Sequence, residues 1–219
     1  MTKYRILNTY CGIGGNRKLW DMPLKEKFGN DYQIVAIEYN EEIAAIYHDF
    51  FPNDGIIVTD AHQYLLEHFK EFDFIWSSPP CQSHSRMIIS GTNRKKNVYP
   101  DMKLYQEIIL LNNWFKGRFV IENVKPYYNS LVNPSIELDR HLFWCNYLVS
   151  KVNVIKEKNV ARQNADQRFG FDIRKYKINH RKDQILRNLV NPEIGLHFLN
   201  RALEIKEANN VTQKTLFDD

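Results

Sequence analysis

Short apolar runs alternate with helical patterns along the first 125 residues, and this alternation constrains the fold more than any other feature. Runs typical of strands lie at 4–9, 33–37, 55–58, 72–76 and 118–121, and helical periodicity covers 40–50, 61–69 and 102–115. Strands that alternate with helices form a parallel sheet with helices on both of its faces. The sequence therefore predicts an α/β fold.

The composition narrows the class of protein. The chain has 219 residues, of which 43% are hydrophobic and 13% aromatic, enough for one sizeable core and too many for a disordered chain. No apolar run resembles a signal peptide or a membrane span. Cys11, Cys81 and Cys145 are too far apart for a metal-ligand pattern, which favours free thiols. We therefore expect a cytoplasmic protein without membrane contact.

A basic stretch follows the alternating region. Between Lys151 and Val190, eleven Lys and Arg residues accompany four Asp and Glu residues, whereas the whole chain has a net charge of +4. Such a segment favours contact with a polyanion, although a solvated lysine-rich loop would have the same composition. Its weak periodicity predicts a small, mostly irregular insert at 150–188.

A helix start lies just beyond this insert. Asn191 is a good N-cap, Pro192 suits the first turn, and Glu193 lies near the positive end of the helix dipole. We therefore expect three parts: a main domain at 1–149, the insert at 150–188, and a C-terminal helix within 189–219 that returns to the main domain.

The motif that points most specifically to a reaction lies between Phe72 and Gln82. The apolar run ends in Ser77-Ser78-Pro79-Pro80, and the strand should stop there because proline cannot extend a sheet ladder. Cys81 would then lie on a rigid loop at the carboxyl end of a strand, where open α/β sheets bind ligands. A thiol at this edge suggests a nucleophile; the alternative is a small buried residue that caps the strand.

A glycine turn and two acids predict a nucleotide-like ligand. Gly12-Ile13-Gly14-Gly15 follows the first strand and lets a ligand approach the backbone. Glu38 follows the glycine turn at nearly the sequence spacing at which an acid contacts ribose hydroxyls in dinucleotide-binding folds. Asp60 could accept a hydrogen bond from an adenine amino group. Alternatively, Glu38 is a helix-start charge and Asp60 an N-cap. Because the GxGxxG and Walker patterns are absent, S-adenosylmethionine fits better than a pyrophosphate ligand.

A further acid completes a family pattern. Glu122 follows the fifth strand, so it would share the sheet edge of Cys81, although alone it would suit a solvated strand end. The order of the motifs resembles the cytosine-C5 DNA methyltransferase family: the glycine turn, Glu38, Asp60, Pro80-Cys81-Gln82, Glu122-Asn123-Val124 and Arg140-His141-Leu142-Phe143-Trp144. The likeness covers 4–147 and returns at 191–199. It implies a Rossmann-like S-adenosylmethionine-dependent methyltransferase sheet, with a reduced target-recognition region at 150–188.

The resemblance implies covalent chemistry on a cytosine in double-stranded DNA. In this family a cysteine thiolate, here Cys81, adds to C6, and a glutamate, here Glu122, contacts N3 and the exocyclic amine. C5 then takes the methyl group from S-adenosyl-L-methionine, which leaves S-adenosyl-L-homocysteine, and loss of the C5 proton and of the cysteine follows. The base must be flipped out of the stack. Asn123 would brace the Cys81 loop.

The resemblance also assigns the remaining site residues. The catalytic set is Cys81, Glu122, Arg140, Asn123 and Gln82. The cofactor would contact Tyr10, Gly12, Ile13, Gly14, Gly15, Glu38, Tyr39, Asp60, Ala61, Pro80, Asn191 and Glu193. DNA would contact a mobile loop over 83–100, through Ser83, His84, Ser85, Arg86, Arg94 and Lys95, and the insert, through Arg174, Lys175, Lys177 and Arg181. Alternatively, the loop is a solvated connection and His84 is a surface residue.

This chain departs from the family pattern at the residue that contacts the cytosine base. The family usually carries two arginines spaced by one residue before the Phe143-Trp144 position, one of which contacts the cytosine O2. Here the stretch is Asp139-Arg140-His141. Arg140 is the candidate for that contact, and His141 is the alternative.

Two other functions remain open at this stage. The first is cytosine-C5 methylation of transfer RNA by the same cysteine chemistry. The second is a non-catalytic DNA-binding subunit of a modification system, which would need neither Cys81 nor Glu122. The preferred function would suit a prokaryotic or phage-encoded enzyme, with a cognate restriction enzyme or a companion methyltransferase as its partner.

Overall fold

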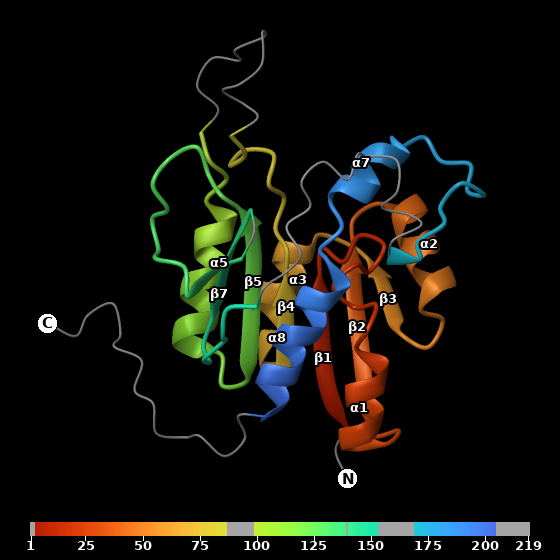
Figure 1. Ribbon diagram of the computed structural model, residues 1–219, viewed down its shortest axis with the longest axis horizontal. Coiled ribbons are helices and arrows are strands. Elements are labelled where there is room, and N and C mark those ends of the chain that lie inside the picture. Colours follow the sequence, from red (N-terminus) through yellow and green to blue (C-terminus); the bar gives the residue numbers. More distant parts are fainter. Residues whose placement is uncertain (1–2, 87–98, 139, 153–168, 205–219) are drawn as a thin grey trace, which may run out of the picture.

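The computed structural model describes residues 3–86, 99–138, 140–152 and 169–204 (Figure 1). A seven-stranded sheet forms the centre of these residues, in the order β3-β2-β1-β4-β5-β7-β6. The strands are β1 (Tyr4–Thr9), β2 (Tyr32–Glu38), β3 (Gly55–Val58), β4 (Phe74–Ser77), β5 (Arg118–Val124), β6 (Ile136–Leu138) and β7 (His141–Cys145). Strands β1 to β5 pair in parallel, and β7 is antiparallel to both of its neighbours. This mixed, Rossmann-like sheet confirms the predicted fold class.

Helices cover both faces of the sheet. They are α1 (Asp21–Phe28), α2 (Glu41–Phe50), α3 (Ala61–His68, followed by a short 3-10 turn), α5 (Lys103–Trp114), α7 (Lys182–Arg187) and α8 (Pro192–Glu204). Figure 1 shows α8 across one face of the sheet. Residues of α1 and α8 share one buried cluster with the sheet, and residues of α3 and α5 share another.

The strands are apolar at consecutive positions because both faces of the sheet are buried. In β1, Ile6 belongs to the cluster beneath α1 and α8, whereas Leu7 belongs to the cluster beneath α3 and α5. Successive side chains of a strand point to opposite faces, so a doubly covered strand needs apolar residues at every position. The apolar runs found in the sequence are therefore the central strands of the sheet.

The described part of the predicted insert packs against the main domain. Phe171 is fully buried and lies edge-on to the Phe50 ring of α2, with 4.9 Å between ring centroids. Further along, the Tyr176 hydroxyl donates to the Asp49 carboxylate at 2.9 Å, and the Asn179 amide donates to the Glu42 carboxylate at 3.0 Å. Residues 171–185 are thus joined to α2 by apolar and polar contacts.

The chain from Val190 into α8 lies directly on the glycine turn. A Cβ atom on Gly195 would stand 2.1 Å from the Asn16 carbonyl oxygen, and a Cβ on Gly15 would stand 2.5 Å from the Val190 carbonyl oxygen. Only glycine permits backbones to approach this closely. The turn after β1 and the start of α8 therefore form one packed unit.

The helices that the structure describes are too short and too polar for a membrane span.

Candidate active site

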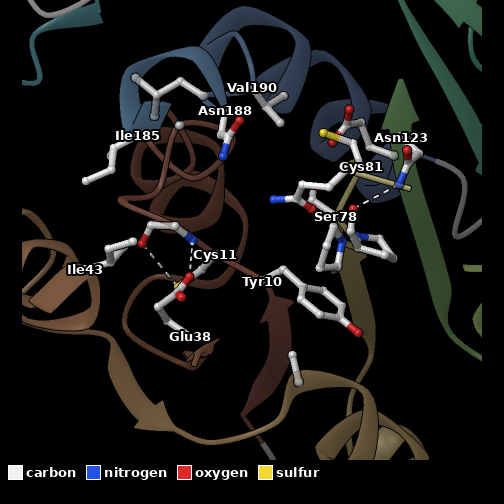
Figure 2. Close-up of a pocket in the computed structure, with 18 of the residues that line it drawn as sticks. Tyr10, Cys11, Glu38, Ile43, Ser78, Cys81, Asn123, Ile185, Asn188 and Val190 are labelled. Atoms are coloured by element: carbon white, nitrogen blue, oxygen red, sulfur yellow. Dashed lines mark hydrogen bonds between the residues drawn. The ribbon is translucent and has the colours of Figure 1, made fainter. Parts of the chain in front are cut away.

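A cavity of about 590 Å³ opens at the carboxyl ends of the parallel strands (Figure 2). This is the edge at which open α/β sheets bind ligands, and the volume suits a small-molecule site. From the predicted cofactor set, the lining includes Tyr10, Gly12, Ile13, Gly15, Glu38, Tyr39, Asp60, Ala61 and Pro80. From the predicted catalytic set, it includes Cys81, Gln82, Glu122, Asn123 and Arg140. The structure therefore brings most of both sets to one cavity.

Glu38 fixes the glycine turn on the cofactor side of the cavity. One carboxylate oxygen accepts from the Gly12 amide at 3.0 Å, and the other accepts from the Asn40 amide at 3.0 Å. A carboxylate has about four acceptor positions, so each oxygen keeps one for a ligand. The Glu38 side chain thus supports the backbone and still faces the cavity.

Asp60 is both a helix cap and a cavity residue. Its side chain accepts from the Gln63 amide at 3.0 Å, which caps α3. That hydrogen bond, with the nearby Lys103 ammonium, holds the pKa of Asp60 below its usual value. Asp60 is therefore a carboxylate at neutral pH that caps α3 and also lines the cavity, and its contact with adenine stays a prediction.

Asn123 holds the segment that carries Cys81. Its side-chain amide donates to the Pro79 carbonyl oxygen at 2.9 Å, and both groups are buried. Beyond the prolines, the backbone amides of His84 and Ser85 donate to the Cys81 carbonyl oxygen at 3.0 and 2.9 Å. Contacts on both sides of Cys81 therefore fix its backbone at the cavity wall.

The environment of Cys81 favours its thiol form. Burial raises the pKa of Cys81, the Glu122 carboxylate raises it further, and the Arg140 guanidinium acts in the opposite direction. A thiolate is the form that attacks an electrophile. A base or a positive charge must therefore reach the thiol before it can react.

His141, rather than Arg140, lies next to Glu122. The antiparallel register of β5 and β7 pairs Val124 with His141, and the His141 Nε2 atom lies 3.5 Å from a Glu122 carboxylate oxygen. The two side chains are 14% and 9% exposed. Arg140 is exposed, and its guanidinium donates to the Arg187 carbonyl oxygen at 3.2 Å. Arg140 thus lies at the rim of the cavity and His141 lies inside it.

Residues 4–133 match the family model of the C-5 cytosine-specific DNA methylases. The chain belongs to this family. It is similar to the tRNA (cytosine(38)-C(5))-methyltransferases of Rattus norvegicus, at 27% identity, and of Homo sapiens, at 28%. Each of these matches spans 124 residues, which is 52% of this chain and 31% of the relative. The chain therefore covers about a third of the length of these curated relatives.

Two solved structures are also similar to this chain. A mutant of DNMT2 from Spodoptera frugiperda shares 27% identity at a TM-score of 0.39, over 59% of this chain and 38% of that one. The methyltransferase EhMeth from Entamoeba histolytica shares 18% identity at a TM-score of 0.38, over 60% of this chain and 41% of that one.

The cavity fits the cofactor of the C-5 cytosine methylase family. Family membership implies S-adenosylmethionine, which offers ribose hydroxyls and an adenine amine to acceptors. Glu38 and Asp60 are carboxylate acceptors on the cavity wall. At Gly12, a Cβ would meet nothing within 4 Å, so the turn leaves open space on a residue that lines the cavity. The two acceptors and the open space therefore suit this cofactor.

Three residues of the predicted cofactor set lie elsewhere. Gly14 packs on the end of α2, since a Cβ there would stand 3.0 Å from the Tyr47 ring and 2.3 Å from the ring of Phe51, the residue that follows the helix. The Asn191 side chain accepts from the Glu193 amide at 2.9 Å, which caps α8. Asn191 and Glu193 line a separate, smaller cavity beside Lys18. All three residues thus lie outside the lining of the main cavity.

The predicted nucleic-acid residues of the 83–100 loop divide into three groups. His84 is only 1% exposed, and its Nδ1 atom lies 2.6 Å from the Tyr128 hydroxyl. The His84 ring is thus buried in this structure, and its contact with DNA from a mobile loop stays a prediction. The Ser83 hydroxyl accepts from the Asp101 amide at 2.9 Å, Ser85 forms a bridge with Pro126, and Arg86 donates to the Pro126 carbonyl oxygen at 3.2 Å. Arg94 and Lys95 lie outside the described residues.

The basic residues of the insert are exposed, and two of them pair with neighbouring acids. Arg174 pairs with Asp172 at 2.8 Å, and Arg181 pairs with Asp183 at 2.8 Å. Lys175 and Lys177 are also exposed. Lys175 and Lys177 thus place positive charge on the surface. The charge of each of these two arginines is balanced by an acid two residues away.

Sequence reasoning missed one wall of the cavity and one buried acid. The wall consists of residues on and around α7: His180, Gln184, Ile185, Arg187, Asn188, Leu189 and Val190. The acid is Glu107 of α5, which is fully buried. A signal for Glu107 was present, because it lies on the same helical face as Leu104, Ile108 and Leu111.

Proposed function

We propose that this chain transfers a methyl group from S-adenosyl-L-methionine to C5 of a flipped cytosine in double-stranded DNA, through a covalent adduct with Cys81. The observation that carries the proposal is the placement of Cys81 and Glu122 at one cavity, with the Cys81 segment tied to the neighbouring Asn123. A thiol and a carboxylic acid at one site are the two groups that addition to a cytosine ring requires.

Each residue has a separate role in the proposed reaction. The Cys81 thiolate adds to C6 of the cytosine, and the Glu122 carboxyl group donates a proton toward N3, which moves electron density to C5. S-adenosylmethionine, when bound, supplies an electrophilic methyl group. A base then takes the C5 proton, the Cys81–C6 bond breaks, and N3 returns its proton to Glu122, which restores the thiolate, the carboxyl group and the aromatic ring. Asn123 keeps the Cys81 segment in place throughout.

DNA is the proposed substrate because of the charge beside the cavity. The segment that carries Lys175 and Lys177 packs on α2 and continues into the α7 wall of the cavity. Exposed lysines at this place could neutralise phosphates on either side of a flipped base. The family model that matches the chain is also named for DNA.

Transfer RNA is the second candidate substrate. The observation that favours it is the similarity to curated relatives named tRNA (cytosine(38)-C(5))-methyltransferases. The same cavity would receive an unpaired cytosine from a folded RNA, without the cost of opening a duplex.

The two substrates can be separated directly. The protein is incubated with methyl-labelled S-adenosylmethionine and either duplex DNA or transfer RNA, and 5-methylcytosine is mapped in the products. We expect label in duplex DNA that declines as salt rises. Label in transfer RNA alone would show that the second candidate is correct. Absence of label from both, with intact binding of S-adenosylhomocysteine, would refute both candidates and favour a non-catalytic subunit.

The roles of His141 and Arg140 can be compared in the same assay. We expect His141→Gln to lower the single-turnover rate by about a hundredfold, because the His141 Nε2 atom lies 3.5 Å from the carboxylate of the acid Glu122. Arg140→Gln is the matched control at the adjacent position. Its expected loss is about threefold, since its guanidinium contacts the Arg187 backbone at the rim. A larger loss for Arg140→Gln would reverse the assignment.

A further inference from the structure

One buried acid contacts several parts of the cavity wall from within the core. Glu107 is 0% exposed on a helix face that is otherwise apolar. A carboxylate is costly to remove from water unless hydrogen bonds replace its hydration. One Glu107 oxygen accepts from the Tyr10 hydroxyl at 2.7 Å and lies 2.9 Å from the His62 Nδ1 atom. The other accepts from the Ser77 hydroxyl at 2.6 Å.

The three partners of Glu107 belong to three different segments of the site. Tyr10 itself lines the cavity. His62 follows Asp60 and Ala61, which line the cofactor side. Ser77 ends β4 and directly precedes the segment that carries Cys81. Figure 2 shows Tyr10 between Glu38 on one side and Ser78 and Cys81 on the other. A single carboxylate therefore joins the cofactor side of the cavity to the nucleophile side.

The Tyr10 backbone shows why such a contact is needed. Tyr10 has a φ of +54°, in the left-handed region that residues with a Cβ rarely adopt. Backbone of this kind persists only where surrounding contacts fix it. The next amide, of Cys11, donates to the Ile37 carbonyl oxygen at 3.0 Å. The hydroxyl contact with Glu107 fixes the ring, so contacts hold both the backbone beside Tyr10 and the end of its side chain.

We propose that Glu107 is a positioning residue that aligns the cofactor wall with the Cys81 segment. Through Tyr10 it sets the aromatic ring on the cavity wall, and through Ser77 it sets the end of β4 from which the Cys81 segment departs. The Ser77 part of the proposal rests on the proposed function, because it concerns the reactivity of Cys81. The Tyr10 part concerns cofactor binding alone.

Two single-atom deletions separate these two effects. Tyr10→Phe keeps the ring and removes the hydroxyl, so we expect S-adenosylhomocysteine to bind about tenfold more weakly in calorimetry, with little change in the single-turnover rate at saturating cofactor. Ser77→Ala removes the other contact, so we expect the opposite pattern: about a tenfold lower rate with unchanged affinity for S-adenosylhomocysteine. Glu107→Gln brings an NH₂ group toward three hydrogen-bonding partners and should show both losses.

A matched control distinguishes positioning from simple loss of stability. Ile108→Ala removes a fully buried side chain next to Glu107 in the same helix. It should lower the unfolding free energy without changing affinity or rate in the folded protein. If Ile108→Ala reproduces the losses of Glu107→Gln, or if Tyr10→Phe and Ser77→Ala show no such split, Glu107 has only a structural role. These two deletions decide the question even if Glu107→Gln does not fold.

The proposed function and this proposal can fail separately. If the unmodified protein methylates neither DNA nor transfer RNA, the proposed function is wrong. Calorimetry with S-adenosylhomocysteine on Tyr10→Phe would still test the link between Glu107 and the cofactor wall. Unchanged affinity in that variant would overturn the link.

Discussion

Cys81→Ser is expected to abolish methyl transfer and to leave the fold and the affinity for S-adenosylhomocysteine unchanged. Serine has nearly the same size as cysteine, so the backbone contacts on both sides of position 81 should persist. A hydroxyl is a much weaker nucleophile than a thiolate near neutral pH, and no adduct with C6 would form. Initial rates with labelled cofactor and calorimetry with S-adenosylhomocysteine measure the two quantities independently.

Cys145→Ser provides the control for this substitution. Cys145 is buried in β7, and its thiol donates to the Tyr147 carbonyl oxygen at 3.3 Å, a contact that a serine hydroxyl can retain. Methyl transfer by Cys145→Ser should stay near that of the unmodified protein. Surviving activity in Cys81→Ser would instead show that the reaction does not pass through a covalent cysteine adduct.

Phe198→Ala should remove a large part of the stability of the whole chain. Phe198 is fully buried in α8, stacks on the Phe143 ring with 4.6 Å between centroids, and lies edge-on to Trp76 at 5.8 Å. Truncation of a buried Phe to Ala costs about 3–5 kcal/mol, and a domain has a total of about 5–15 kcal/mol. Urea denaturation followed by tryptophan fluorescence measures the loss.

Glu193→Gln is the control for Phe198→Ala in the same helix. Glu193 is exposed in the first turn of α8, so the change should cost less than about 1 kcal/mol. A loss of similarly small size for Phe198→Ala would mean that α8 is only loosely attached to the sheet. The predicted return of 189–219 to the main domain would then lack energetic support.

The central strands could be predicted because burial on both faces leaves an unbroken apolar signal. Strand β7 carries the same apolar signal, because Leu142 to Cys145 are all buried. The sequence predicts a motif at this stretch but not a strand that pairs with β5. Helix α1 was missed for another reason. Leu24 is its single buried residue, and Pro23 lies within its first turn, so the helical period is weak there.

The positions of Cys81, Glu122, Glu38 and Asp60 could be predicted because parallel strands bring their carboxyl ends to one edge. The α7 wall could not, because it depends on contacts between residues distant in sequence. The bond between Tyr176 and Asp49 joins positions 127 residues apart. The position of His141 beside Glu122 also needed the strand register, which pairs His141 with Val124 and Phe143 with Glu122.

The close contact of Gly15 with Val190 and of Gly195 with Asn16 bears on how the protein is made. The glycine turn leaves the ribosome before most of the described chain, whereas its packing partner follows about 175 residues later. Until residues 190–195 arrive, the turn lacks the backbone that confines it, and the α7 wall of the cavity does not yet exist. A nascent chain can therefore form most of its sheet before this wall of the cavity is in place, so the site is completed after the sheet.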